Sequence, residues 1–313
     1  MKMKNEMKLT GLFVAVGMAA APVVARAQDE RTFTQLDTTV RLDRGGSVDL
    51  SLVSGRIRVT GWDQPNVKLS ASIESGLLRF SANSSRVTLS VDDEGDRHYK
   101  HRNVGEARFD VSVPRGSRLI LEAVSGDVTA KGSQGEIEAS SVSGDVDVTD
   151  GIRTVSVESV SGSAHAAQVN GNLRAETVSG DLRAENVSGN VQASTVSGDV
   201  KLIGIQSRDV RTESVSGELT YTGTIEPSGR YSFESHSGSI NLTIPRNAGA
   251  QFSVETFSGS IDTDFPVTLR PGLKRGENHM EFTIGDGRAR VTAQTFSGEI
   301  IISNGSTTRR EDE

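Results

Sequence analysis

The middle of the chain repeats a short glycine-containing unit at a fixed interval. Ser-Gly pairs recur there at every eighteenth position, and in the later copies at every ninth. They begin at Ser125, Ser143, Ser161, Ser179, Ser188 and Ser197. Gln134-Gly135 and Asn170-Gly171 stand at two of the half-way points, so the underlying unit has nine residues and reads Val-Ser-Gly-Asp-Val-x-Ala-x-x. A fixed internal period is the signature of a repeat architecture, in which each unit packs on its neighbours.

Polar and apolar positions alternate inside the unit. The fifth and seventh positions are apolar and the fourth, sixth and eighth are polar, as in Asp181-Leu-Arg-Ala-Glu185. A period of two predicts a half-buried β-strand, and glycine at the third position gives the backbone freedom that a tight corner needs. The first position is also apolar, and we expect its side chains to point inward at the corner. It holds Val160, Val169, Val178, Val187, Val196 and Ile205.

A single strand-turn unit cannot bury its apolar face, but stacked copies can, at about 4.8 Å per coil. The repeat therefore predicts an all-β fold, a β-solenoid built from nine-residue strand-turn units. The uniformly small seventh position, with Ala166, Ala175, Ala184 and Ala193, indicates a narrow interior. Two-strand coils made of two units each are favoured because Ser-Gly occupies every odd unit, whereas the even units vary. Three-strand coils, whose columns would recur at every twenty-seventh position, are the alternative.

The rest of the chain divides around this repeat. We expect residues 28–120 to form an N-terminal β region that continues or caps the solenoid, and residues 121–220 to form the regular nonad repeat. Residues 221–302 carry longer, aromatic-containing strands with Ser-Gly spacings of 19, 21, 21 and 39, which predict wider coils and a cap. The Pro- and Gly-containing stretch 264–278 reads as a loop, Ile300-Ile301-Ile302 as the last strand, and 303–313 as a disordered tail.

Residues 1–27 have the pattern of a secretory signal peptide. Three lysines precede an apolar stretch that ends in Ala25-Arg26-Ala27, the small-x-small sequence of a cleavage site. An uncleaved membrane anchor is the alternative. We expect an exported protein, periplasmic, cell-surface or secreted, with no transmembrane segment in the mature chain. The chain has no cysteine and a net charge of −7, and an acidic surface does not suit nucleic acid as a partner.

Three features together are typical of a known family. They are the Ser54-Gly-Arg-Ile-Arg-Val-Thr-Gly-Trp-Asp63 segment, the Val113-Pro-Arg-Gly116 turn and the Val-Ser-Gly-Asp-Val units. With them the chain, over about residues 33–302, resembles the bacterial putative-adhesin β-strand-repeat family, a family of unknown function. The resemblance implies a β-solenoid in an envelope or surface setting. It supplies no catalytic residues to look for.

Few residues suggest chemistry. The only close histidine pair, His98 and His101, stands in a charged loop, where solvated side chains are the expected state. Without cysteine, thiolate catalysis and thiolate zinc sites are impossible. The sequence contains no Gly-x-Ser-x-Gly elbow, no phosphate-binding loop and no dinucleotide fingerprint. We therefore predict no catalytic residues and no cofactor.

The carboxylates at the fourth position of the repeat are the strongest candidates for a site. In a two-unit coil Asp127, Asp145, Asp181 and Asp199 share one edge, with Ser163 between the two pairs. They could bind calcium, or act as paired carboxylates on a polysaccharide. Alternatively, they cap the turns by accepting backbone N–H bonds. The regular repeat and the absence of the extra glycines of calcium-binding β-rolls favour capping.

Trp62, the only tryptophan, is a candidate for stacking on a sugar, although packing at the N-terminal end is the simpler interpretation. The sequence as a whole predicts a noncatalytic envelope scaffold or adhesin, whose partner is a surface protein or glycan. A carbohydrate-active or calcium-binding solenoid, and an accessory protein of envelope stress signalling, are the alternatives. The oligomeric state does not follow from the sequence.

Overall fold

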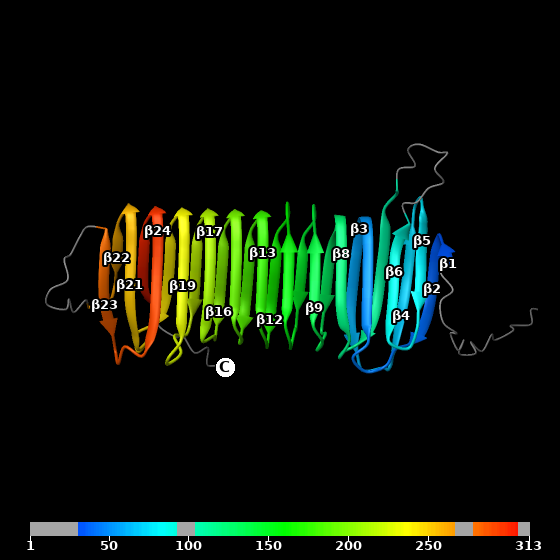
Figure 1. Cartoon of the computed structure of the whole chain (residues 1–313), viewed down its shortest axis with the longest axis horizontal. Coiled ribbons are helices and arrows are strands. Elements are labelled where there is room, and N and C mark those ends of the chain that lie inside the picture. The colour runs from blue at the N-terminus through cyan, green and yellow to red at the C-terminus, as the bar shows by residue number, and fades with distance from the viewer. Residues whose placement is uncertain (1–30, 93–103, 267–277, 306–313) are drawn as a thin grey trace, which may run out of the picture.

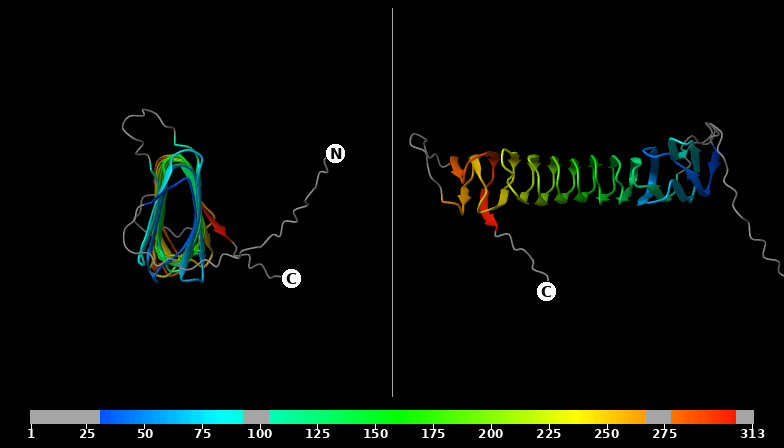
Figure 2. Two further views of the ribbon diagram at one scale, coloured as in Figure 1. Left: turned by 90° about the vertical axis from the view of Figure 1, so that its right-hand side faces the viewer. Right: turned by 90° about the horizontal axis from the view of Figure 1, so that it is seen from below.

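The chain winds into a flattened β-solenoid. The computed structural model describes residues 31–92, 104–266 and 278–305, and no helix occurs within these ranges. The predicted signal peptide and the pair His98 and His101 lie outside them. Two long sheets face each other and meet at two narrow edges (Figures 1 and 2). The all-β solenoid that the repeat predicts is confirmed.

Each sheet is a ladder of strands from successive coils. Sheet A runs in the order β1 (Arg31–Phe33), β5 (Leu77–Ala82), β6 (Arg86–Asp92), β3 (Ser47–Trp62), β8 (Arg118–Lys131), β9 (Ile137–Ser141), β11 (Val155–Ser159), β13 (Leu173–Ser179), β15 (Val191–Ser197), β17 (Asp209–Ser216), β19 (Arg230–Ser237), β24 (Ala289–Ser297), β21 (Ala250–Ser258), β23 (His279–Ile284). The first half of β3 and of β8 belongs to this sheet, and the second half continues past the corner into the other.

Sheet B runs in the order β2 (Gln35–Arg41), β4 (Asn66–Ile73), β7 (Ala107–Pro114), β3, β8, β10 (Val146–Thr149), β12 (Ala164–Val169), β14 (Leu182–Val187), β16 (Val200–Ile205), β18 (Leu219–Gly223), β20 (Ile240–Pro245), β25 (Ile300–Gly305), β22 (Ile261–Thr263). Val146 pairs with Val128 on one side and Ala164 on the other, and each partner lies two nonads away in the sequence. The central coils therefore contain two strands and two nine-residue units, as the Ser-Gly spacing favours.

The interior is narrow and apolar. The fifth and seventh positions of the repeat point inward, so that Leu173, Ala175, Leu182 and Ala184 are each at most 2% exposed. Alanine at the seventh position lets the two sheets approach closely. Tyr221 and Phe233 fill the wider coils, with their ring centroids 5.1 Å apart.

The two corners of each coil differ in backbone conformation. The Ser-Gly corner holds a column of glycines in close contact, and a β-carbon on Gly162 would lie 2.2 Å from the carbonyl oxygen of Gly144. In five successive coils the opposite corner has one residue with positive φ. This residue is Gly132 (72°), Asp150 (61°), Gln168 (55°), Asn186 (53°) and Gly204 (69°). Such φ values lie in the left-handed region that glycine occupies without strain.

This difference corrects the prediction that all first-position residues point inward. At the left-handed corner they do: Val169, Val187 and Ile205 are at most 1% exposed. At the Ser-Gly corner they do not, because the chain stays extended through the valine and its side chain points to solvent. Val160, Val178 and Val196 are 43–48% exposed.

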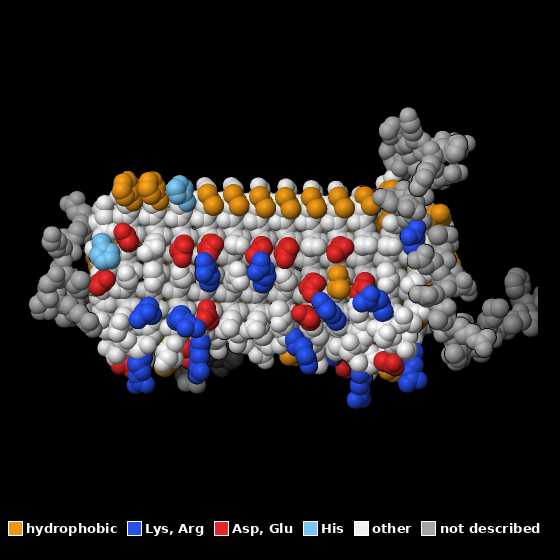
Figure 3. Space-filling model, in the orientation of Figure 1, with side chains coloured by type: hydrophobic (Ala, Val, Ile, Leu, Met, Phe, Trp, Pro, Cys, Tyr) orange, Lys and Arg blue, Asp and Glu red, His pale blue; other side chains and the backbone are white. Residues whose placement is uncertain are grey.

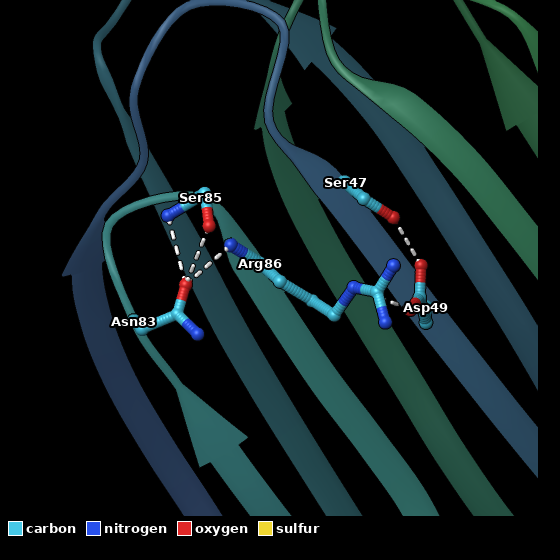
Figure 4. Close-up of polar contacts among 5 residues, drawn as sticks. All are labelled: Ser47, Asp49, Asn83, Ser85 and Arg86. Atoms are coloured by element: carbon cyan, nitrogen blue, oxygen red, sulfur yellow. Dashed lines mark hydrogen bonds and ion pairs between the residues drawn. The ribbon is translucent and has the colours of Figure 1, made fainter. Parts of the chain in front are cut away.

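Antiparallel strands cover the N-terminal end of the solenoid. A hairpin of β5 and β6 adds to β3 in sheet A, while β2 and β4 extend β7 in sheet B. At the hairpin turn, Asn83 Oδ1 accepts bonds from the backbone N–H groups of Ser85 (2.9 Å) and Arg86 (2.8 Å). Arg86 lies 3.4 Å from Asp49 of β3, which also accepts the Ser47 hydroxyl (Figure 4).

The C-terminal coils do not stack in chain order. β24 lies between β19 and β21 (Figure 1). In the other sheet, β25 lies between β20 and β22. The chain therefore leaves one coil position empty after β20, builds β21 and β22 beyond it, and returns to fill it. β25 is the last strand of the described residues in sequence, but it is not at the end of the stack of coils in space. It extends to Gly305, so residues 303–305 belong to a strand rather than to the expected tail.

In the part of the chain that the structure describes, no helix is both long and apolar enough to cross a membrane.

Candidate functional site

The four aspartates of the repeat lie on one edge of sheet B, beside the Ser-Gly corner. Their side chains bond to the backbone of the next coil. Asp127 Oδ1 accepts the N–H of Asp145 at 3.1 Å, and Asp181 Oδ1 accepts the N–H of Asp199 at 3.0 Å. Asp145 and Asp199 do the same for Ser163 (2.8 Å) and Glu218 (3.0 Å). Each carboxylate thus joins two successive coils.

This geometry supports the capping interpretation of the aspartates. A side-chain oxygen that accepts a backbone N–H has one lone-pair direction fewer for a cation. Asn172 plays the same part at the opposite corner, where its Oδ1 accepts the N–H of Asn190 at 3.1 Å. Because a neutral amide does this as well, the contact does not require charge. Among the described residues, no group of three or more His, Asp and Glu side chains is arranged to hold a metal ion.

Trp62 closes a loop at the N-terminal end. It ends β3, and its Nε1 donates a hydrogen bond to the carbonyl oxygen of Asn66 at 2.8 Å. The indole N–H is therefore occupied by the β3–β4 connection. Beside it, Arg115 Nε lies 2.8 Å from Asp63 Oδ1, which ties this connection to the turn after β7. The structure does not bring Trp62 together with the aspartate column.

The repeated hydroxyls also serve the corners. Residues three positions before the corner glycine are Ser or Thr with buried side chains. Ser141 Oγ donates to the carbonyl oxygen of Gly126 at 2.8 Å, and Ser159 Oγ to that of Gly144 at 3.0 Å. In these two coils the hydroxyl satisfies a carbonyl group of the corner, whereas the equivalent hydroxyls of Thr195, Ser214 and Ser235 have no hydrogen-bond partner.

The tyrosines of the wider coils belong to the core. Tyr221 OH donates to the carbonyl oxygen of Thr224 at 2.8 Å, and Tyr231 OH donates to that of Ser207 at 2.5 Å. Burial raises the pKa of Tyr221 far above its ordinary value and also raises the pKa of Tyr231. Both phenols therefore stay protonated and act as hydrogen-bond donors inside the solenoid.

A continuous apolar row runs along the Ser-Gly edge of the solenoid. We call it the apolar ridge, and in spatial order it consists of Val124, Val142, Val160, Val178, Val196, Val215, His236, Phe296 and Phe257. Its valines are 43–49% exposed, and Phe257 is 68% exposed. Figure 3 shows the ridge along the upper edge as a row of hydrophobic side chains with one histidine among them.

The aromatic end of the ridge is a stack of three rings. The centroids of His236 and Phe296 are 5.1 Å apart, and those of Phe296 and Phe257 are 4.8 Å apart, with the planes within 10° of parallel. The spacing follows the rise from strand to strand, so the rings stack on each other along the solenoid axis.

Sequence reasoning missed the ridge because it placed every first-position residue in the interior. One signal could have separated the two edges. Where the coils widen, the odd units place His236, Phe257 and Phe296 before Ser-Gly. The same coils already hold Tyr231, Phe233 and Phe252 in the interior, so a further ring in each corner would overfill it, which indicates that these residues face outward.

Among solved structures, a "putative lipid binding protein" from Parabacteroides distasonis has a similar fold, with 12% sequence identity and a TM-score of 0.53; the match covers 87% of this chain and 97% of that one. A "putative adhesin" from Bacteroides fragilis matches with 12% identity and a TM-score of 0.43, with 86% and 96% covered. No curated protein matches the sequence.

A family model extends the comparison from fold to sequence. The Toastrack DUF4097 model matches residues 110–303, which include the whole nonad repeat and the C-terminal coils. These residues make up more than half of the chain, in agreement with the resemblance to adhesin-like repeat proteins, and the protein belongs to the Toastrack DUF4097 family.

Proposed function

We propose that the protein is a noncatalytic interaction scaffold of the bacterial envelope, exported by its N-terminal segment. The observation that carries this proposal is the use made of the repeated polar residues. The four aspartates that could do chemistry, and hydroxyls such as those of Ser141 and Ser159, are hydrogen-bonded to the backbone of the corners instead. The exposed side chains of successive coils form straight, parallel columns along the solenoid, and these columns are the surface available to a partner.

The shape suits this role. Within the described residues, sheet A contains 14 hydrogen-bonded strands from β1 to β23, which at about 4.8 Å each gives a rod roughly 60 Å long. Backbone pairing continues through both sheets, and such a solenoid resists bending. A rigid rod binds without the entropy loss of ordering a flexible chain.

The test is a binding screen on the full chain against a glycan array and extracted envelope proteins, with calcium titration followed by thermal unfolding. Saturable binding of a glycan or protein, with no change in the bound molecule, supports a scaffold. Hydrolysis or elimination of a glycan would contradict it. A rise in melting temperature with calcium would show that the aspartate column holds the ion and would contradict the capping interpretation.

A further inference from the structure

The apolar ridge is not required by the core of the protein. The same first position of the repeat is filled by Val169, Val187 and Ile205 at the other corner, and there the side chains are buried. On the ridge the valines touch solvent, so burial does not explain them. A preference for extended backbone does not explain them either, because threonine is also β-branched and carries a hydroxyl that water can bond. None of the nine ridge positions holds threonine.

The ridge is long and continuous. Its nine residues lie on neighbouring coils about 4.8 Å apart, so the ridge is about 38 Å long. Scattered exposed apolar residues are normal, but contiguous rows of this extent on soluble proteins mark interaction sites.

The backbone beneath the ridge is already paired. Val142 N–H donates to Ala123 O at 3.1 Å, and Ser143 N–H donates to Val124 O at 2.8 Å. The same bonds recur in the next coil, where Val160 N–H donates to Ser141 O at 3.1 Å. A partner therefore cannot add a strand along this edge, and it must bind through side chains.

Acidic columns border the ridge on both sides. The column on sheet A holds Glu122, Ser140, Glu158, Glu176, Ser194, Glu213, Glu234, Gln294 and Glu255. The column on sheet B holds Asp127, Asp145, Ser163, Asp181, Asp199, Glu218, Ser239, Glu299 and Ser260. Neither column, all of whose members lie in the described part of the chain, contains Lys or Arg. On the side away from the ridge, Glu176 and Glu213 form ion pairs with Arg174 and Arg211, and Asp199 forms one with Lys201. Figure 3 shows the acidic groups of sheet A directly below the ridge.

The charges argue against two occupants, and the ring stack argues against a third. A second copy of the chain, ridge against ridge, would bring four acidic columns together. An anionic membrane would meet the same repulsion. A sugar would need free ring faces, but Phe296 has both faces covered by His236 and Phe257. The partner that the charges favour has an apolar row with cationic residues on both sides.

One apolar row between two charged rows is the pattern of a coiled-coil seam, where residues a and d pack and residues e and g form ion pairs. A heptad helix presents an apolar residue every 3.5 residues, or about 5.2 Å, close to the spacing of the ridge residues. About 25 helical residues match the length of the ridge. We propose that the apolar ridge binds a cationic amphipathic helix of a partner polypeptide, laid lengthwise along the solenoid. This inference rests on the proposed scaffold function and names its partner class.

The test uses a synthetic 28-residue peptide with Leu at heptad positions a and d and Lys at e and g. Its control has Glu in place of every Lys. Isothermal titration with the full chain is expected to give saturable 1:1 binding of the Lys peptide and none of the Glu peptide. The affinity should fall at least tenfold between about 50 mM and 500 mM salt, because the flanking ion pairs are exposed and screened.

The variant that tests the ridge replaces Val142, Val160, Val178 and Val196 by Thr, which keeps the β-branched backbone preference. It is expected to retain the circular dichroism spectrum and lose at least tenfold in affinity. The matched control is Ile152→Thr, which alters a residue of similar exposure, 45%, away from the ridge. It should bind as the wild type does.

Other outcomes would overturn the inference. Equal binding of the Lys and Glu peptides, or undiminished binding by the Thr variant, would remove the ridge as the site. Ridge-dependent binding to phosphatidylcholine vesicles without peptide binding would assign a lipid surface, and ridge-dependent self-association in sedimentation would assign a second copy. If the Lys peptide does not bind, while the wild type and the Thr variant both bind the same envelope protein or glycan, the helix-binding inference is wrong but the scaffold function stands. Turnover of a glycan removes the scaffold function itself.

Discussion

At the scale of single residues, close contact explains the corner glycine of the coil at Gly162. Gly162 does not have a positive φ, yet a β-carbon there would lie 2.2 Å from the carbonyl oxygen of Gly144. We expect Gly162→Ala to lower the free energy of unfolding by about 2–3 kcal/mol, because two packed backbones must separate. Chemical denaturation measures this. Gly116→Ala is the control, since nothing lies within 4 Å of its added carbon, and an equal loss in both variants would contradict the contact explanation.

The aspartate column allows a second test at this scale. Asp145 accepts the Ser163 N–H and has Asp127 stacked beside it, so its oxygen stabilises the corner while its charge repels a neighbour. Asp145→Ala should lower the free energy of unfolding by about 0.5–1.5 kcal/mol, the net contribution of one hydrogen bond. Asp145→Asn should be neutral or slightly stabilising, because the amide oxygen still accepts, as Asn172 does. Thermal unfolding compares the two, and a large loss in the Asn variant would mean that the charge itself is needed.

At the scale of the strand-turn unit, the left-handed corner is the weakest fit between sequence and backbone. Glycine fills it at Gly132 and Gly204, but Gln168 holds φ at 55° with a long side chain. We expect Gln168→Gly to stabilise the protein by roughly 0.5–1 kcal/mol, because relief of left-handed strain exceeds the extra entropy of glycine in the unfolded chain. Asn186→Gly should gain less, since asparagine tolerates this region. Melting temperatures rank the variants, and a loss at Gln168 would show that its side chain makes a needed contact.

The same unit shows what the sequence could predict. The spacing of Ser-Gly, and the alternation of Leu182 and Ala184 with polar neighbours, were enough to predict the strands, the corners and the coil of two units. The direction of the first-position valines was not predictable from composition, since Val178 and Val187 are the same residue in the same repeat position. What separates them is the backbone of the preceding corner, where Asn186 is left-handed and Thr177 is not. Periodicity carries no such information.

At the scale of the whole molecule, the order of the coils also escapes sequence reasoning. Spacing predicts neighbours only while each coil follows the last, and here β21 skips one coil position that β24 later occupies. Both arrangements of the final coils pair Ser-Gly with Ser-Gly, so the columns at Ser237, Ser258 and Ser297 fit either order. The observed order leaves β21 pairing with the antiparallel β23, which covers the open edge of sheet A.

A solenoid in which each coil contacts only its neighbours should respond locally to damage. Gly162 lies between β11 and β12, whose partners in the two sheets are β9, β10, β13 and β14. We therefore expect Gly162→Ala to speed hydrogen exchange in these six strands, because their local opening becomes easier while distant coils keep their own packing. Exchange measured by mass spectrometry should be unchanged in β4 and β21. A uniform increase along the chain would mean that the rod opens as one cooperative unit, and the stacked coils would then share their stability over the full length.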